Sequence, residues 1–364
     1  MSLRTGWWLP DANQTEKRLL ENEYLKREFK LLIYSGPQER DLQLINAQER
    51  QSALVLTDTS VKNFKALRKF PRNSIVLFIL SDETYNLKLS FFALFNSRIK
   101  VIVRNYPLGR IRKIRKKVCL FLAKSKRVCS ARNLAYLFPK AFASGVYLTL
   151  CQLLITILSS ILRKPIHVIP QGYNSGFAQI YAKTFHLQSD ESLFDFALRV
   201  KEGEFKKKLD LVFLGQIGSL DRRIMLEEAQ EGDFEKALET KILINEKYNE
   251  GQNSLKQQEF FELVLKSRYA LCPPGNYSGS TFRFFESLIA HTYPICDSFI
   301  LSDPLYDSNL SLKWTNFKSN RIADHLENIH QQNEEIRAEI SRVLELIESL
   351  KAQISLSLIG KGAI

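Results

Sequence analysis

Short runs of apolar residues alternate along the chain with polar segments long enough to form helices. Apolar runs of four to eight residues that end at polar or turn-forming residues are typical of strands buried on both faces of a sheet. Strands that alternate with helices of about ten residues predict βαβ units and a parallel sheet. Eight such runs are present, at 31–34, 53–56, 74–80, 100–103, 166–169, 209–214, 269–272 and 293–296.

The eight predicted strands form two groups of four, which predicts an α/β protein with two domains. A chain of 364 residues is long enough for both. We predict an N-terminal domain over 1–165, with an insertion at about 107–164 that lacks the strand pattern. A second domain is predicted over 166–320, and a heptad-patterned helix over 321–364.

The heptad pattern near the C-terminus has apolar residues at alternating spacings of four and three, from Ile322 to Ile354, with the polar Asn333 at one position. Such a repeat predicts a long helix. Two arrangements explain it. The helix lies along the α/β domains, or it pairs with a second copy in a coiled coil whose register Asn333 fixes. A homodimer through 322–354 is therefore possible.

The charge of the chain is concentrated in one segment. The composition, 45% hydrophobic and 25% charged, is typical of a soluble globular enzyme, and the net charge is +13. No acidic residue lies between Glu83 and Asp190, where we count 18 lysines and arginines. The rest of the chain has more acidic than basic residues. This asymmetry predicts an anionic partner: a membrane surface, a nucleic acid or a phosphorylated substrate.

Within this segment, residues 141–162 form an uncharged stretch that follows a strongly basic one at 110–140. The stretch is long enough to cross a bilayer, but its serines, threonines and glutamine make it polar for a span. A buried helix, a helix or hairpin on the membrane surface, and a spanning helix remain alternatives. We expect 107–164 to bind an anionic membrane surface. Few aromatic residues lie among the lysines and arginines, so we expect no nucleic-acid partner.

The cysteines and the N-terminus predict the compartment. Five cysteines form an odd set without a Cys-x-x-Cys pair, which argues against a disulfide framework or a structural zinc site. The first 17 residues contain no apolar segment behind a basic start, so no secretory signal is predicted. We expect a cytoplasmic protein, peripheral at the inner face of the membrane.

The stretch 269–295 carries the most chemical information. Pro273-Pro274-Gly275 stops a predicted strand, and a loop of small residues then opens a helix. Backbone amides in such a loop can approach an anion, and the helix N-terminus adds positive potential. Arg283 in the first turn can join those amides on a diphosphate. Glu286, on the same helix face, suits the paired hydroxyls of a ribose. An ordinary turn and a solvated Arg283–Glu286 pair explain the same residues.

A family resemblance extends this interpretation. The order of Pro-Pro-Gly, a polar loop, Phe-Arg-Phe-Phe-Glu-Ser-Leu and Tyr-Pro-Ile resembles the nucleotide-sugar motif of exostosin-like glycosyltransferases (glycosyltransferase family 47). It is most similar to the branch that includes ribitol xylosyltransferase and bacterial relatives. His291 departs from the pattern, because relatives usually have a glycine there. Shorter similar pieces occur in the same order, at 80–83, 103–107, 169–173, 213–218 and 221–223.

The resemblance implies a GT-B fold, in which two Rossmann-like domains with parallel sheets face a cleft. The acceptor would lie on the N-terminal domain, and the nucleotide sugar, for which we expect a UDP-sugar, on the C-terminal domain. Arg283 would then meet the diphosphate and Glu286 the ribose. The residues implied to line the donor are Pro274, Gly275, Ser278, Gly279 and Ser280, and those implied for a facing phosphate loop are Gly215, Gln216 and Arg222 or Arg223.

Sugar transfer requires a stabilised leaving diphosphate and a deprotonated acceptor hydroxyl. The sequence has no Asp-x-Asp motif that could bridge a metal to the diphosphate, so we expect arginines to stabilise it, without a metal or other cofactor. Asp82 and Glu83 end a predicted strand where ligands bind in such sheets, and one of them is our candidate catalytic base. A turn or helix cap also explains them. Arg104, Tyr106 and Tyr173 end strands and are candidates for contact with donor or acceptor.

The sequence therefore predicts a hexosyl- or pentosyltransferase that acts on a glycan or lipid-linked glycan in cell-surface polysaccharide synthesis. Inversion at the anomeric carbon is implied by the resemblance alone. Two other classes of protein are compatible with the sequence: a coiled-coil scaffold whose α/β part has lost catalysis, and a basic protein that binds nucleic acid through 84–189.

Overall fold

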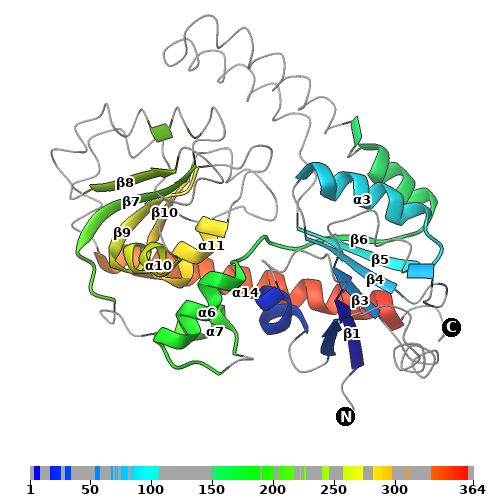
Figure 1. The fold of residues 1–364 in the computed structure, drawn as a ribbon, viewed down its shortest axis with the longest axis horizontal. Helices are drawn as coiled ribbons and strands as arrows, with labels where there is room; N and C mark the ends of the chain where they lie inside the picture. The colour runs from blue at the N-terminus through cyan, green and yellow to red at the C-terminus, as the bar shows by residue number, and fades with distance from the viewer. Residues whose placement is uncertain are drawn as a thin grey trace, which may run out of the picture. The chain divides into compact units, whose positions relative to one another are not determined.

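The computed structural model is a mixed α/β protein with two parallel sheets and a long C-terminal helix (Figure 1), which confirms the predicted class. The described residues fall into two compact units. The first contains those up to 105, with 150–170 and 346–359, and the second contains those from 171 to 345. The structure describes residues 4–8, 17–25, 29–33, 54–57, 67–68, 70, 72, 75–80, 83–105, 150–151, 153–188, 191–200, 205–216, 222, 225–226, 240–245, 257–273, 282–296, 310 and 329–359.

The first unit contains a six-stranded parallel sheet in the order β2-β1-β3-β4-β5-β6. Every side chain of β4 is buried, as its unbroken apolar run predicts. Helix α3 (Glu83–Phe95) packs against β4 and β5. A short helical segment, α1 (Lys17–Leu19) and η1 (Leu20–Leu25), lies between the first two strands in the chain. The strands are β1 (Arg4–Trp8), β2 (Phe29–Ile33), β3 (Leu54–Thr57), β4 (Ile75–Ile79), β5 (Ile99–Arg104) and β6 (Ile166–Val168).

The second unit contains a four-stranded parallel sheet in the order β10-β9-β7-β8. After β7 the chain forms β8, on one side of β7, and then β9, on its other side. The chain connections therefore diverge between β7 and β9. Helix α10 packs against β7 and β9, and α11 packs against β10 and α7. The elements are α6 (Ser175–Thr184), α7 (Leu193–Arg199), β7 (Leu209–Gln216), β8 (Thr240–Asn245), α10 (Gln257–Lys266), β9 (Ser267–Leu271), α11 (Phe282–Ile289) and β10 (Tyr293–Ile295).

Three strands differ from the sequence-based expectation. Strands β1 and β8 were not predicted, since Arg4, Thr5 and Lys241 interrupt their apolar runs. Strand β6 pairs with β5 in the first sheet, whereas we expected the segment that begins at residue 166 to open the second domain. The reason is that an apolar run identifies a strand but not its neighbour, which the crossover connection decides.

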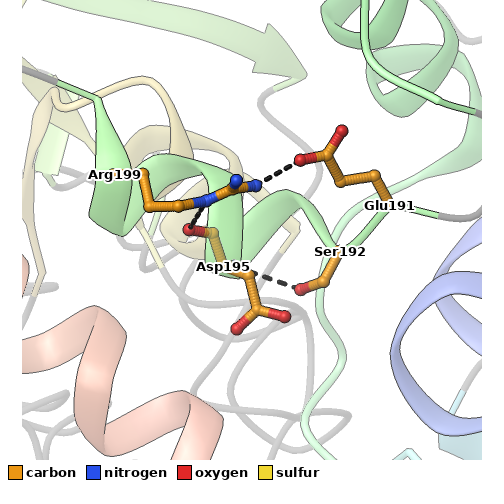
Figure 2. A network of polar contacts seen from close by, with 4 residues as sticks. All are labelled: Glu191, Ser192, Asp195 and Arg199. Carbon is orange, nitrogen blue, oxygen red and sulfur yellow. Dashed lines mark hydrogen bonds and ion pairs between the residues drawn. The ribbon is translucent and has the colours of Figure 1, made fainter.

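Helix α7 begins with a side-chain cap (Figure 2). The backbone N–H of Asp195 donates to the Ser192 hydroxyl at 3.1 Å, which satisfies one of the free donors at the helix N-terminus. Arg199 bonds both the Glu191 carboxylate and the Asp195 carbonyl. The Arg199 side chain is 64% exposed, so its ion pair adds little stability. The cap and the buried apolar face of α7 hold this helix, which in turn supports α11.

The C-terminal helix α14 (Ile329–Ile359) packs on its own chain. In the second unit, Tyr293 donates to Glu335 at 2.5 Å and Gln332 donates to the Tyr269 hydroxyl at 2.7 Å, so α14 is bonded to β9 and β10. These contacts match the first of the two predicted arrangements. A homodimer through 322–354 stays a prediction. The described seam residues buried within the chain are Ile336, Ile340, Val343, Ile347 and Leu350.

The described part of the uncharged stretch 141–162 forms a helix at 150–151 and 153–161, which we call the surface helix. Ile155 is its buried apolar residue, and most of its other apolar side chains are exposed. It is therefore not the buried helix that was one alternative. In the part of the chain that the structure describes, no helix combines the length and apolar character needed to cross a bilayer. The basic segment 110–140 lies outside the described residues.

Candidate functional site

The candidate site lies where β7 and β9 end side by side in the second unit. Ligands of open α/β sheets bind beyond the carboxyl ends of the strands, at the point where the connections diverge. That point is between β7 and β9. Arg222 is a helical residue beyond the end of β7, and Cys272 directly follows β9. Helix α11 then brings Arg283 and Glu286 to this region.

Arg283 is a half-buried cation beside a second arginine. The guanidinium carbon lies 5.6 Å from the centre of the Phe213 ring on β7, and its Nε is buried without a hydrogen-bond partner. Desolvation, together with the nearby Arg222, lowers the pKa of Arg283 to about 10. The side chain therefore stays charged at neutral pH. Two neighbouring guanidinium groups repel each other, so an anion placed between them would be stabilised by both.

Glu286 is a buried acid held by one residue. Its carboxylate accepts hydrogen bonds from the backbone N–H of Asn174, at 3.2 Å, and from the Asn174 side-chain amide. Burial raises the pKa of Glu286 to about 7, although the Asn174 N–H and Arg283 act in the opposite direction. Near neutral pH this carboxyl group can therefore accept a hydrogen bond as a carboxylate or donate one as an acid, and either form can bind a hydroxyl.

Asn174 fixes the position of Glu286 because it also caps a helix. Its side-chain oxygen accepts from the backbone N–H of Phe177 at 2.9 Å, as an N-cap of α6. The amide oxygen is thus directed at α6, and the amide nitrogen is left to donate to Glu286. The sequence did not identify Asn174. An Asn before Ser-Gly is a recognisable cap signal, but nothing in it indicates a partner 112 residues away.

The end of α11 is anchored by two further bonds. Tyr181 of α6 donates to the carbonyl of Ile289 at 3.0 Å, and a ring nitrogen of His291 lies 2.7 Å from the carbonyl oxygen of Ala197 in α7. His291 has a φ of 51°, the left-handed conformation that glycine adopts most easily. This conformation explains why a glycine suits the position. The imidazole bond to Ala197 helps a histidine to occupy it.

A half-buried lysine supports the same turn. Lys207 donates to the Ala290 carbonyl and to the Thr292 hydroxyl, each at 2.9 Å, and burial lowers its pKa well below the usual value. Thr292 in turn donates to the Val264 carbonyl at 2.6 Å, which joins the turn to α10. Arg283 and Glu286 therefore stand on a helix fixed from several sides, as a preorganised binding site requires.

The structure brings together Arg222, Arg283 and Glu286 of the predicted site. Glu83 is the first residue of α3, where an acidic residue is favourable, and its side chain is not described. Tyr173 is buried against Phe194, with ring centres 5.8 Å apart. Gly215 and Gln216 are the last two residues of β7, placed by their backbone alone. The predicted residues outside the described part of the chain are Asp82, Tyr106, Arg223, Pro274, Gly275, Ser278, Gly279 and Ser280.

Arg104 in the first unit is a second unusual cation. It ends β5, in register with Ile79 of β4 and Val168 of β6. Its side chain is fully buried, and none of its three guanidinium nitrogens has a hydrogen-bond partner. Burial lowers its pKa to about 10. An uncompensated buried charge is costly, so proteins retain one chiefly where it has a function. The sequence marked Arg104 as a strand end but gave no sign of its burial.

Glu286→Gln tests the buried acid. The pKa of Glu286 is about 7 in the folded protein and 4.5 for an ordinary glutamate, so between these values the folded state keeps a proton that the unfolded chain has released. The protonated Glu286 carboxyl group contributes its full share to the free energy of unfolding below pH 4.5. This share is lost as the pH rises through 7. We expect the free energy of unfolding of the wild type to fall by roughly 3 kcal/mol relative to the variant between pH 4.5 and 8. Urea unfolding across this range measures the change.

The control is Glu262→Gln on α10, an exposed glutamate whose pKa is lowered by Gln258 and Lys266. The effect of Glu262→Gln on the free energy of unfolding should stay constant between pH 4.5 and 8. A difference between wild type and Glu286→Gln that stays constant from pH 4.5 to 8 would contradict a proton held at Glu286.

Asn174→Ala tests the bond between α6 and Glu286. It removes a helix cap and a donor to a buried carboxyl group, which together should lower the free energy of unfolding by about 2–3 kcal/mol. Ser192→Ala is the matched control, because Ser192 caps α7 through the same type of bond. It should cost about 1 kcal/mol. Urea unfolding at pH 7 compares the two, and equal losses would mean that the amide bond to Glu286 adds no stability.

Comparison with known proteins adds no identification. No known family model and no curated protein matches this sequence. The candidate site is therefore defined by its residues: two arginines and a buried carboxyl group at the carboxyl ends of β7 and β9. Among the described residues, no group of three or more histidine, cysteine or acidic side chains could hold a metal ion.

Proposed function

We propose that the second unit binds the diphosphate and ribose of a nucleotide sugar at the carboxyl ends of β7 and β9. The observation that carries this proposal is the pairing of Arg222 and Arg283 beside the buried Glu286. A diphosphate would neutralise the repulsion between the two guanidinium groups. The ribose hydroxyls would bond the Glu286 carboxyl group, which can act as donor or acceptor near neutral pH.

On this proposal the protein is a GT-B glycosyltransferase of the exostosin-like type. The second unit holds the donor, a UDP-sugar, and the first unit holds the acceptor, a glycan or lipid-linked glycan of the cell surface. The transfer is inverting, needs no metal or other cofactor, and takes place at the cytoplasmic face of the membrane. The resemblance of residues 269–295 to the nucleotide-sugar motif supports this assignment, and so do the two parallel sheets.

In the proposed reaction, an acceptor hydroxyl oxygen forms a bond to the anomeric carbon while the bond from that carbon to the diphosphate breaks. Arg283 and Arg222 stabilise the charge that develops on the leaving diphosphate. With a pKa of about 10, Arg283 remains cationic at the pH of the cytoplasm. The hydroxyl proton passes to a carboxylate, for which Asp82 and Glu83 after β4 are the candidates.

The burial of Arg104 favours an acceptor that carries a negative charge. Arg104 ends β5, the strand next to β4, and Glu83 begins the helix that follows β4 in the chain. A phosphate group of the acceptor, such as the diphosphate of a lipid carrier, would provide the hydrogen-bond acceptors that the buried guanidinium nitrogens lack. The acceptor site would then contain the cation that ends β5 and a base from the segment that follows β4.

Thermal unfolding with a panel of nucleoside diphosphates and their sugars tests the proposal. A ligand at 100 times its Kd adds about 2.7 kcal/mol of apparent stability, which is easily measured. We expect a shift with one nucleotide that disappears in Arg283→Ala. Arg268→Ala is the matched control, because Arg268 lies near the start of β9, away from the site, and should leave the shift unchanged.

Either of two results would contradict the proposal. A shift that survives in Arg283→Ala would exclude this site. The absence of a shift with every nucleotide would favour another class of protein. A dimer that depends on 322–354 would then indicate a scaffold, and binding of nucleic acid that is lost above about 200 mM salt would indicate a nucleic-acid-binding protein.

A further inference from the structure

The surface helix exposes large apolar side chains along one side. Five of them recur at intervals of three and four residues, so they share one helix face. Two phenylalanines of α3 are exposed in the same unit. We call these seven residues the apolar face, and their exposed fractions run from 44% to 68%. They are Leu150, Leu153, Leu154, Ile157 and Ile161 of the surface helix and Phe92 and Phe95 of α3.

The two helices that carry the apolar face are joined at their C-terminal ends. Lys164, just beyond the surface helix, donates to the Asn96 carbonyl at 2.5 Å and to the Ala93 carbonyl at 3.4 Å. These bonds join the end of the surface helix to the end of α3. Ile155, on the opposite side of the surface helix, is buried. The exposed side chains are therefore held outward by a helix that is fixed on its inner side.

The charged residues near the apolar face in the sequence, after Glu83, are all basic. No acidic residue occurs from residue 84 to residue 189, a range that includes the surface helix and all of α3 after Glu83. Lys88 and Arg163 are exposed on or next to these two helices. The same acid-free range contains the basic segment 110–140. A second copy of this chain would bring like charges together, whereas an anionic surface complements them.

Apolar side chains flanked by cations match the interface of an anionic bilayer. A helix that lies in this interface buries its apolar face at the level of the acyl chains and places lysines and arginines among the headgroups. The surface helix ends in a turn at Leu162 and Arg163, and the chain then enters β6 of the sheet. This connection ties the helix to the first unit, as expected for a helix that lies on a membrane.

We propose that the apolar face inserts into the interface of an anionic lipid bilayer and holds the first unit on the membrane. Residues of two helices form the anchor, and the basic residues around it select anionic lipids. The inference does not rest on the proposed transferase activity, because a protein with no donor site would bind vesicles in the same way.

Vesicle co-sedimentation of the full chain tests the anchor. Phosphatidylcholine vesicles are compared with vesicles that also contain phosphatidylglycerol. We expect the wild type to bind the anionic vesicles, and Ile161→Glu and Ile157→Glu to bind at least roughly tenfold more weakly, because each loses apolar burial and places a carboxylate in the interface. Leu356→Glu on α14 is the matched control. Leu356 and Ile161 are both 68% exposed, so the control should bind like the wild type.

The substituted side chains are exposed, so the variants should unfold at the same temperature as the wild type. Should a glutamate on the surface helix prevent folding, Phe95→Ser on α3 tests the same face and should also weaken binding. Binding that is equal in all variants and is removed by salt would overturn the proposal, since the basic segment alone would then account for it. A dimer that Ile161→Glu dissociates, without vesicle binding, would overturn it in favour of a second copy.

Discussion

The buried carboxyl group of Glu286 is the constraint on which the second unit depends. A carboxyl group taken out of water must find hydrogen bonds inside the protein, and Asn174 supplies two of them. Because Asn174 is also the N-cap of α6, these bonds connect the start of α6 to α11. They fix the helix on which Arg283 stands. One amide group therefore links local helix capping to the geometry of the candidate site.

The electrostatics of the site follow from this burial. Glu286 is buried and Arg283 is half-buried, and the loss of water shifts their pKa values to about 7 and about 10. Arg222 adds a second positive charge close to Arg283. In the first unit, the three guanidinium nitrogens of the buried Arg104 also lack hydrogen-bond partners. An anion bound in either unit would supply hydrogen-bond acceptors that these guanidinium nitrogens lack.

The sequence predicted the parts of the fold that depend on local pattern. An unbroken apolar run identified β4, a largely apolar run identified β7, and the motif at 269–295 pointed to Arg283 and Glu286. Features that depend on distant partners were not predictable. The pairing of β6 with β5, the bond from Asn174 to Glu286 and the burial of Arg104 are set by chain segments far apart in sequence. The uncharged stretch 141–162 was ambiguous because its composition suits a core and a lipid interface equally, and only exposure separates them.

A crystal structure of the protein with UDP tests the central claim most directly, because it locates the diphosphate without reference to activity. We predict diphosphate oxygens within hydrogen-bonding distance of Arg283 and Arg222, and the ribose hydroxyls on the Glu286 carboxyl group. The nucleotide would then lie beyond the carboxyl ends of β7 and β9, where the chain connections diverge. A nucleotide bound elsewhere, with Arg283 and Glu286 in contact with protein atoms alone, would contradict the proposed donor site.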